Sequence, residues 1–424
     1  MTVQPPHPRK WTVLAYMSGD SDLEDTEVYS LLQMERVGSN DDVDVVVQLD
    51  RREIPEEHRE HRLGVDGDWS TARRYHVTRG ADHPGEVLYH LDAQPPYADI
   101  RFSATQLSSE LVQDLGEVDS AAGKTLADFL SWGMENYPAE HYLVLLMDHG
   151  YGILGAIQDE SSQELAPLPE LRAALEDAER RTGRRIDIVG FDACLMGLAE
   201  AAYEFKDVTS VVVGSQDYEN VPGWPLAAVL ARLQQESRSA PMPVEEVAGM
   251  IVEEAARTPQ ATPTLSAVRT DRMEQVREAV EGLAGELLEP DVSPYYLRRA
   301  VHSARSFGDP LNPPLGDSVD LVDVAGRIAS HPQLTNPGLQ RAARAVEQAA
   351  GAAVLAECHT PEQDGAHGLS IYMPAFVRRY DVLRNRNPLS SIPEPGERFS
   401  YRKLRFAENA RWEKLLREKF VPVS

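Results

Sequence analysis

The chain has 424 residues, of which 42% are hydrophobic and 26% are charged, so it can bury a core and is not disordered as a whole. At about 150 residues per domain, this length predicts two to three domains, and one large α/β domain with additions fits as well. The 42 Lys and Arg against 68 Asp and Glu give a formal net charge of −26, which argues against nucleic acid and anionic membranes as main partners because both would be repelled.

Cysteine content and hydropathy bear on where the protein works. Two cysteines, Cys194 and Cys358, are too few for a disulfide framework, which favours a reducing compartment. No apolar run approaches the roughly 18 residues of a membrane span. The first ten residues are polar and rich in proline, unlike a signal peptide. We therefore expect a cytoplasmic location and no membrane partner.

The first half of the chain alternates short apolar strands with helices. A polar excursion, rich in Pro, Gly, His and Asp, interrupts it at 80–106. Strand, helix and strand at this spacing indicate right-handed βαβ units and a doubly wound, mostly parallel sheet. The predicted strands are 11–18, 43–49, 71–78, 141–147, 186–191 and 208–214, and the predicted helices are 22–37, 121–136, 169–181 and 195–205.

The second half of the chain has mainly helical periodicity. Two late strands, 353–358 and 368–373, interrupt it. We therefore divide the chain into an α/β core, residues 1–240, and a mainly helical region, residues 241–424, whose late strands can return to the first sheet. The predicted helices of this region are 243–257, 270–288, 295–306, 317–329, 338–352 and 401–419.

Two predicted strands end in reactive side chains, one in His149 and the other in Cys194. Ligands of open α/β sheets bind beyond the carboxyl ends of the strands. On neighbouring strands, about 4.8 Å apart, the imidazole and the thiol would be within reach of each other. The imidazole, and the N-terminus of a helix predicted to begin at Leu195, would both favour the thiolate.

The order of the two residues adds to this interpretation. The histidine precedes the cysteine by 194 − 149 = 45 residues, as in caspase-like rather than papain-like enzymes. The backbone N–H groups of Gly150 and Cys194 can together bind an oxyanion. The structural alternative is a buried cysteine and a histidine in a turn, and the residues alone leave both readings open.

Five longer blocks of sequence, in this order, resemble the clostripain-like cysteine peptidases, relatives of caspases, gingipains and legumains. The resemblance covers nearly the whole chain and implies a caspase-like α/β/α sandwich. It implies a cysteine endopeptidase with His149 as general base and Cys194 as nucleophile, in a dyad that needs no third residue. The blocks are WTVLAYMSGDSDLE at 11–24, TLADFLSWGMENYPAEHYLVLLMDHGYG at 125–152, IDIVGFDACLMGLAEAAYEF at 186–205, VVVGSQDYENVPGWP at 211–225 and HGLSIYMP at 367–374.

The resemblance also implies a preference for a basic P1 residue, usually Arg and sometimes Lys. Asp192 stands two residues before Cys194, so both side chains point the same way in an extended segment. A carboxylate there can hold a guanidinium through two charge-assisted hydrogen bonds, although a helix cap is the alternative role. Asp217 and Glu219 are weaker candidates for substrate binding, and Trp224 is a pocket wall or a core aromatic.

The sequence predicts no metal site, and the chemistry needs no cofactor. The resemblance leaves calcium open, but the acidic cluster Asp20, Asp22, Glu24 and Asp25 lacks a calcium-loop spacing. We interpret this cluster as helix capping and solvated charge. Asp148, on the opposite side of an extended chain from His149, is interpreted as structural.

A basic run lies between the two catalytic blocks, at Arg180, Arg181, Arg184 and Arg185. We hypothesise that the intact chain is latent until it, or an upstream activating protease, cleaves there and opens the cleft. The alternative is a helix end whose cations favour the C-terminal dipole. The expected partners are protein or peptide substrates with basic P1 residues. The competing function is a non-catalytic caspase-like scaffold or binding protein.

Overall fold

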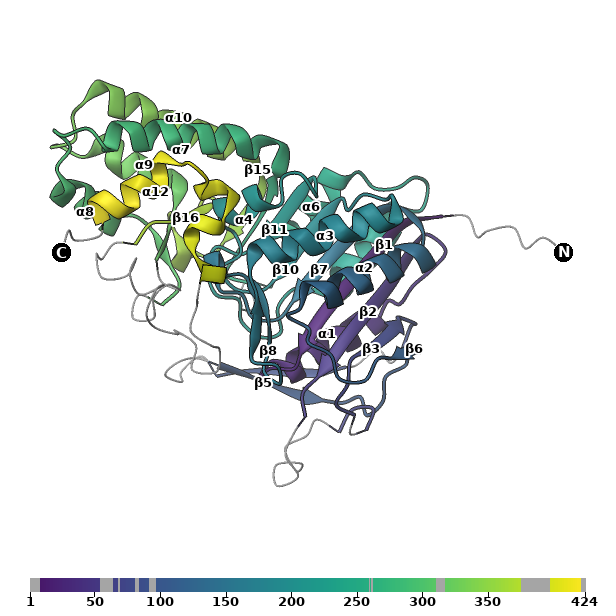
Figure 1. The fold of residues 1–424 in the computed structure, drawn as a ribbon. Helices are drawn as coiled ribbons and strands as arrows, with labels where there is room; N and C mark the ends of the chain where they lie inside the picture. The colour runs from purple at the N-terminus through teal and green to yellow at the C-terminus, as the bar shows by residue number, and fades with distance from the viewer. Residues whose placement is uncertain are drawn as a thin grey trace.

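A nine-stranded sheet forms the centre of the computed structural model, which describes residues 8–53, 64–67, 69–80, 84–90, 97–258, 260, 262–309, 317–374 and 397–420. The strands are β1 (Arg9–Gly19), β2 (Val43–Arg51), β3 (Arg73–His76), β6 (Glu110–Asp114), β7 (Ala139–Met147), β10 (Ile188–Asp192), β11 (Val211–Gly214), β12 (Thr264–Arg269) and β15 (Val354–His359). Their order across the sheet is β15-β12-β11-β10-β7-β1-β2-β3-β6 (Figure 1).

The five central strands of this sheet, β11, β10, β7, β1 and β2, run parallel, and antiparallel pairs complete both sides. Side chains of β1 alternate between the two faces. Leu14 and Tyr16 pack into one core, whereas Trp11 and Val13 pack into the other. A strand that is apolar on both faces must be covered on both, as is typical of a parallel sheet inside an α/β protein.

Helices cover both faces of the sheet. α2 (Gly123–Asn136), α3 (Leu168–Thr182) and α4 (Ala199–Glu204) share the core of Leu14 and Tyr16. α1 (Glu24–Glu35), α5 (Leu226–Glu236) and α6 (Val244–Ala255) share the core of Trp11 and Val13. The predicted α/β/α sandwich with a mostly parallel sheet is therefore confirmed.

The C-terminal part of the chain contributes to this sheet and adds a helical layer. β12 and β15 lie beyond residue 240 yet join the sheet, so the sheet draws strands from both sides of the predicted boundary. The other late strand, β16 (Ser370–Tyr372), pairs with β14 (Ser318–Asp320) in a separate sheet that β13 (Ser306–Phe307) completes. The added helices are α7 (Met273–Leu287), α8 (Pro294–His302), α9 (Leu321–Ser330), α10 (Pro337–Ala353) and α12 (Arg411–Leu415).

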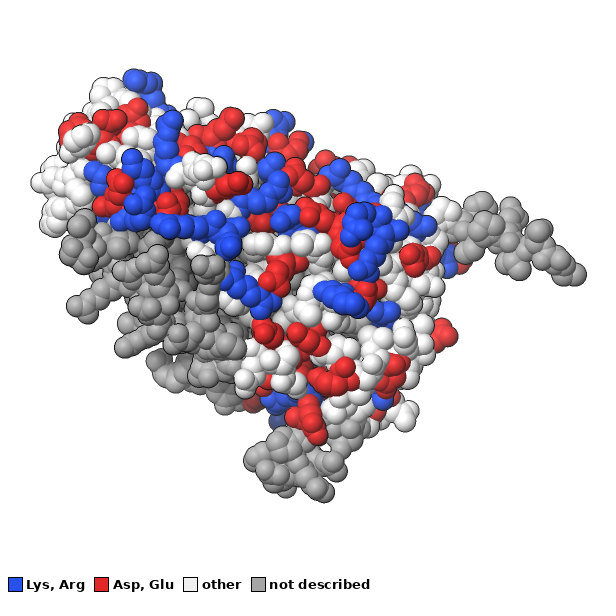
Figure 2. Space-filling view, viewed as in Figure 1, with Lys and Arg blue, Asp and Glu red and all other residues white. Residues whose placement is uncertain are grey.

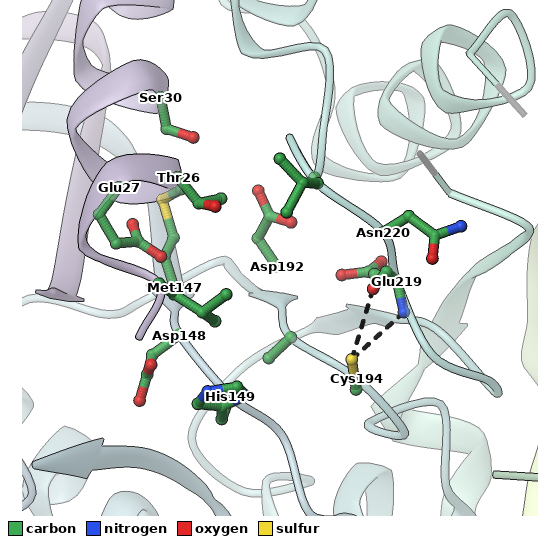
Figure 3. A pocket seen from close by; sticks show the side chains of 14 residues that line it. Thr26, Glu27, Ser30, Met147, Asp148, His149, Asp192, Cys194, Glu219 and Asn220 are labelled. Carbon is green, nitrogen blue, oxygen red and sulfur yellow. Dashed lines mark hydrogen bonds between the residues drawn. The ribbon is translucent and has the colours of Figure 1, made fainter. Parts of the chain in front are cut away.

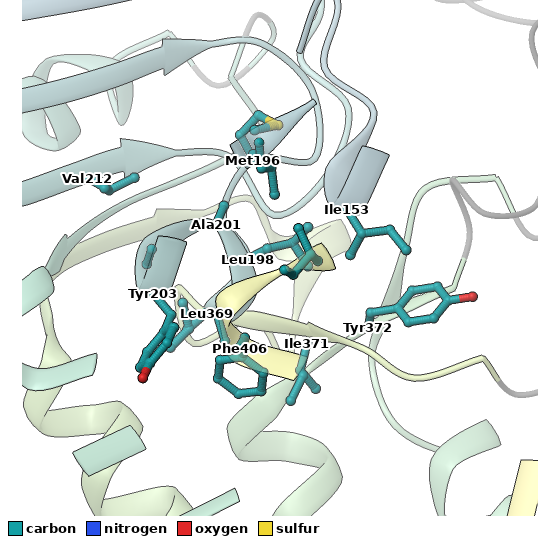
Figure 4. Packing of buried hydrophobic residues seen from close by; sticks show 14 of the residues in the cluster. Ile153, Met196, Leu198, Ala201, Tyr203, Val212, Leu369, Ile371, Tyr372 and Phe406 are labelled. Atoms are coloured by element: carbon teal, nitrogen blue, oxygen red, sulfur yellow. The ribbon is translucent and has the colours of Figure 1, made fainter. Parts of the chain in front are cut away.

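The C-terminal segments hold the region that follows Cys194. Phe406 packs edge-on against Tyr203 of α4, with ring centroids 5.5 Å apart (Figure 4). The buried Glu200 carboxylate accepts the Tyr401 hydroxyl at 2.9 Å and the Tyr372 N–H at 3.0 Å. Segments at the end of the chain thus fix α4 from the side opposite the sheet.

Several predicted elements needed correction. The helix predicted at 195–205 begins only at Ala199, and the excursion at 80–106 contains a hairpin of β4 (Gly85–His90) and β5 (Tyr97–Phe102). The helix predicted at 401–419 consists of short 3-10 turns followed by α12 and a π-helical turn, Leu416–Phe420. β6, β12 and α5 were not predicted. Among the described residues, no helix has the length and apolar character needed to cross a bilayer.

Candidate active site

Three neighbouring parallel strands bring the candidate catalytic residues together. β7 lies between β1 and β10, and Met147 of β7 is in register with Asp192 of β10. His149 and Cys194 each stand two residues beyond that pair, so the sheet presents both at the same edge. Both residues line one cavity, which α1 closes on the far side (Figure 3).

Gly150 allows the two strand ends to touch. A Cβ atom at this position would lie 2.0 Å from the Cys194 carbonyl oxygen and 2.9 Å from its nitrogen, so any other residue would push the segments apart. An isolated bridge pairs Gly150 with Ala156, and its hydrogen bonds run from Ile157 N–H to the His149 carbonyl and from Tyr151 N–H to the Gly155 carbonyl. Neither hydrogen bond of this bridge uses the Gly150 N–H, so that group can donate to an oxyanion.

His149 has a carboxylate partner in the β1–α1 loop. Its Nε2 lies 2.6 Å from Asp22 Oδ1. The hydrogen bond lowers the pKa of Asp22, so the ionised carboxylate accepts and Nε2–H donates, which leaves Nδ1 for the reaction. Burial acts to lower the pKa of His149, but the hydrogen bond to Asp22 and the charges of Asp148 and Asp22 outweigh it and raise that pKa.

The sequence interpretation missed this role of Asp22 and assigned it to capping or solvated charge. Asp22 precedes α1, whose N-cap residue Leu23 has no side-chain cap. The position of Asp22 in the sequence could have indicated this role. Asp22 follows β1, and the parallel neighbours β1 and β7 end at the same edge of the sheet.

The thiol of Cys194 hydrogen-bonds to the backbone of a loop rather than to the imidazole. The Glu219 N–H donates to Sγ at 3.2 Å, and Sγ–H donates to the Glu219 carbonyl at 3.7 Å (Figure 3). Burial and the charge of Glu219 raise the thiol pKa to about 12. The expectation that this thiol ionises easily is therefore wrong for the conformation described.

The backbone after Cys194 explains part of this difference. Leu195 is buried and adopts a left-handed conformation with φ 64°, which a β-branched or bulky side chain rarely does without support. Leu195 N–H donates to the Asp217 carbonyl at 3.1 Å, and Gly197 N–H donates to the Ser215 carbonyl at 2.6 Å. Because the chain turns here, α4 begins only at Ala199 and not directly after the thiol.

Carboxyl groups form the floor of the cavity. Asp192 ends β10, is 8% exposed and accepts the Trp224 N–H at 3.1 Å. Glu219 accepts the Trp224 indole N–H at 3.0 Å, and its Oε2 has no hydrogen-bond partner among the described residues. Burial raises the pKa of Asp192 to about 7. Burial, together with the charge of Asp192, raises the pKa of Glu219 well above its ordinary value.

The other two candidates for substrate binding lie outside the cavity lining. The Asp217 carboxylate accepts Gly308 N–H at 2.9 Å and Gln363 Nε2 at 2.6 Å, so it fastens the loop to the C-terminal region. Trp224 is fully buried and supports Asp192 and Glu219 from behind. Both residues therefore position the cavity rather than face it.

Asp148 is buried behind the imidazole. It accepts the Ser21 hydroxyl at 2.9 Å and the Gln158 N–H at 2.5 Å. Burial raises its pKa to about 7. The carboxyl group links β7 to the β1–α1 loop and to β8 (Ala156–Asp159), which is the structural role expected for it.

The acidic cluster in the β1–α1 loop does not converge on a metal position. Glu24 pairs with Arg51 at 2.6 Å, Asp22 with His149, and Asp25 accepts the N–H of Thr26 at 3.0 Å. In the described part of the chain, no group of three or more His, Cys, Asp or Glu side chains is arranged to hold a metal ion. Glu24, Asp22 and Asp25 are thus each engaged with a partner within the protein.

The basic run lies at the opposite edge of the sheet. Arg180 and Arg181 end α3, and Arg184 and Arg185 precede the start of β10, whereas the cavity lies beyond its carboxyl end. Figure 2 shows basic and acidic side chains mixed on the face of the molecule to which α3 belongs. Arg181 pairs with Asp128 at 2.6 Å, and Arg184 donates to the Tyr142 hydroxyl at 2.7 Å. None of the four lines the cavity.

Comparison with known proteins assigns the family. The model of the Clostripain family matches residues 15–418. The chain belongs to the clostripain family. Clostripain from Hathewaya histolytica is 22% identical over 210 residues, which are 47% of this chain and 36% of that protein. The chain thus spans little more than a third of that curated relative.

Two solved structures of similar proteins support the fold. An inactive zymogen C11 protease from Parabacteroides distasonis has a TM-score of 0.61 at 19% identity, over 96% of this chain and 99% of that one. A secreted C11 cysteine protease from Bacteroides thetaiotaomicron, in complex with an irreversible peptide inhibitor, has a TM-score of 0.58 at 17% identity, over the same shares. Both extend the match over nearly the whole clostripain-family chain.

Proposed function

We propose that this clostripain-family protein is a cysteine endopeptidase that cleaves peptide bonds after Arg or Lys. The observation that carries the proposal is a cavity at one sheet edge that His149 and Cys194 line together with the buried carboxyl groups of Asp192 and Glu219. A nucleophile and a base lie at its mouth, and acceptors for a cation lie within it. A non-catalytic scaffold would need neither group.

The chemistry follows from these positions. The Cys194 sulfur attacks the scissile carbonyl carbon, and His149 takes the thiol proton and gives it to the leaving amine. The N–H groups of Gly150 and Cys194 hold the oxyanion that forms in between. Water then attacks the thioester carbonyl carbon while His149 takes a proton from that water, the C–S bond breaks to release the peptide acid, and His149 gives that proton to the sulfur. Asp22 stabilises the imidazolium at each proton transfer.

The conformation described corresponds to a latent enzyme in this proposal. Among the described residues, Cys194 Sγ hydrogen-bonds only to the Glu219 backbone, and its pKa is raised to about 12. A thiol in that state is a poor nucleophile at neutral pH. The similar Parabacteroides distasonis protein is described as an inactive zymogen, which agrees with latency here.

Activation by cleavage between His149 and Cys194 stays a prediction, and so do the upstream protease and the cytoplasmic location. The basic run at the far sheet edge does not cover the cavity, so a cut there would act only through movement of α3 or β10. Mass spectrometry of new N-termini after incubation of the pure protein identifies the cleavage position. A fully active uncut chain would exclude this trigger.

The decisive experiment is a P1 profile with fluorogenic peptides ending in Arg, Lys, citrulline or norleucine. We expect turnover of the Arg and Lys peptides, and none by a Cys194→Ala variant that keeps its melting temperature. An electrophilic peptide with P1 Arg should label Cys194 in the parent protein, and the labelled site is read by mass spectrometry. Unchanged turnover by Cys194→Ala would refute the proposal, and no labelling and no turnover even after limited proteolysis of the parent protein would favour the scaffold.

A further inference from the structure

The wall of the cavity opposite the catalytic strands is a polar face of α1. Thr26, Glu27 and Ser30 line the cavity on this side (Figure 3). Their spacing of three and four residues places them on one helix face. The neighbouring positions Val28 and Leu31 are apolar and pack into the core instead.

These three side chains are buried without partners. Glu27 is 2% exposed, Ser30 is fully buried and Thr26 is 9% exposed. Glu27 Oε2, Thr26 Oγ1 and Ser30 Oγ have no hydrogen-bond partner in the described part of the protein. An unsatisfied buried polar atom destabilises a protein by about 1–3 kcal/mol. Three such atoms facing one cavity indicate a polar ligand that satisfies them.

The charge of the cavity defines this ligand further. Asp192 and Glu219 lie on one side and Glu27 on the other, and the electrostatic influence of Asp192 reaches Glu27. Three carboxyl groups face one cavity, and an ionised carboxylate accepts hydrogen bonds, so a donor with positive charge is the ligand that these groups favour. A planar guanidinium has five N–H donors along its edges and can serve both walls at once, whereas an ammonium is a compact point charge.

We propose that Glu27, with Thr26 and Ser30, forms the far wall of the specificity pocket and gives it a preference for Arg over Lys at P1. This inference rests on the proposed peptidase function and deepens it. Asp192 and Glu219 would hold either cation. Glu27 would reach the outer nitrogens of an arginine, which a lysine side chain lacks.

The test is Glu27→Gln, which keeps shape and removes the carboxylate. We expect kcat/KM for an Arg peptide to fall about 10- to 100-fold, mainly through KM, as the loss of one charge-assisted hydrogen bond predicts. The Lys peptide should lose less than about threefold, so the Arg-to-Lys ratio falls. Asp25→Asn is the matched control, because it removes a charge from α1 at a residue outside the cavity lining.

A binding readout makes the test independent of turnover. In a Cys194→Ala background, agmatine presents a guanidinium and 1-aminopentane an ammonium. Glu27→Gln should weaken agmatine at least tenfold more than 1-aminopentane in calorimetry, and Ser30→Ala should do so to a smaller extent if Glu27→Gln does not fold.

The outcomes separate this inference from the function on which it rests. Equal losses for Arg and Lys, or an unchanged ratio, would overturn the role of Glu27 while leaving the peptidase in place. Failure of the parent protein to bind agmatine would overturn it as well. Absence of both turnover and labelling at Cys194, even after limited proteolysis of the chain, would instead count against the proposed function itself.

Discussion

The contact between Asp22 and His149 gives the sharpest prediction about catalysis. The structure predicts that Asp22→Asn keeps the imidazole in place, because the amide oxygen can still accept Nε2–H, while the negative charge is lost. The Nε2 to Oδ1 distance is 2.6 Å, but the Asp22 side chain is 71% exposed and that of His149 is 27% exposed. Water therefore screens the pair, which places it near the high-dielectric limit of about 1 kcal/mol.

This magnitude sets the size of the effect. About 1 kcal/mol corresponds to roughly a fivefold change in rate, since 1.36 kcal/mol is tenfold. We expect the plateau of kcat/KM to fall about fivefold in Asp22→Asn. Because Asp22 contributes to raising the His149 pKa, the acidic limb of the pH profile should move to lower pH. Asp22→Ala should lose more, since it also removes the acceptor that orients the ring.

The assay is the pH dependence of kcat/KM for an Arg peptide from pH 5 to 9, with Asp25→Asn as control. Asp25 lies in the first turn of α1, three residues after Asp22, and its carboxylate accepts the Thr26 N–H and is not bonded to His149, so the profile of Asp25→Asn should match that of the parent. An acidic limb that stays in place in Asp22→Asn, or moves to higher pH, would refute the assigned contact.

Two further predictions concern buried groups whose pKa is raised. Asp50 accepts the Ser120 hydroxyl at 2.6 Å, and within the described ranges its Oδ1 has no hydrogen-bond partner. Burial raises the pKa of Asp50 from 3.8 to about 8. The Asp50 carboxyl group loses its proton at lower pH in the unfolded chain than in the folded one. Ionisation of Asp50 therefore lowers the free energy of unfolding as the pH rises from about 4 to 8. We expect Asp50→Asn to raise the melting temperature, and to raise it more at the upper end of that pH range. Equal gains at pH 4.5 and 8 would contradict this. Because burial raises the Cys194 pKa to about 12, alkylation of Cys194 by iodoacetamide in a Cys358→Ala background should still accelerate above pH 10; mass spectrometry showing a plateau near pH 9 would contradict the buried thiol.

The central strands were predictable because burial on both faces leaves a plain signal. β1, β7 and β10 were predicted within two residues of most of their ends from runs such as VLAYM and YLVLLM. β12 was missed because Thr264 and Ser266 are polar yet fully buried. Thr264 bonds the Ser215 hydroxyl and Ser266 the Gly368 carbonyl, partners that are 49 and 102 residues away in sequence. Such partners appear only after the chain has folded.

The same limit applies to the site. The positions of His149 and Cys194 followed from the carboxyl ends of two strands, whereas the role of Asp22 required knowledge of a contact across 127 residues. The start of α4 was misplaced because Leu195 takes a left-handed conformation that only a glycine would have indicated.

The direction in which the Cys194 pKa shifts was the property hardest to predict from the sequence. The cause of this shift connects the reactivity of the thiol to the specificity of the pocket. Sequence pattern showed which groups meet at the sheet edge, but not how many charges gather beneath them. Burial of Cys194 together with the charges of Glu219, Asp217 and Asp192 disfavours the thiolate. The pocket carboxyl groups Asp192 and Glu219 are also the acceptors assigned to a basic P1 side chain. A cation seated among them offsets that charge, so it favours thiolate formation next to the bound peptide. One charge distribution then accounts for both the proposed selection of a basic residue and the raised pKa of the Cys194 thiol.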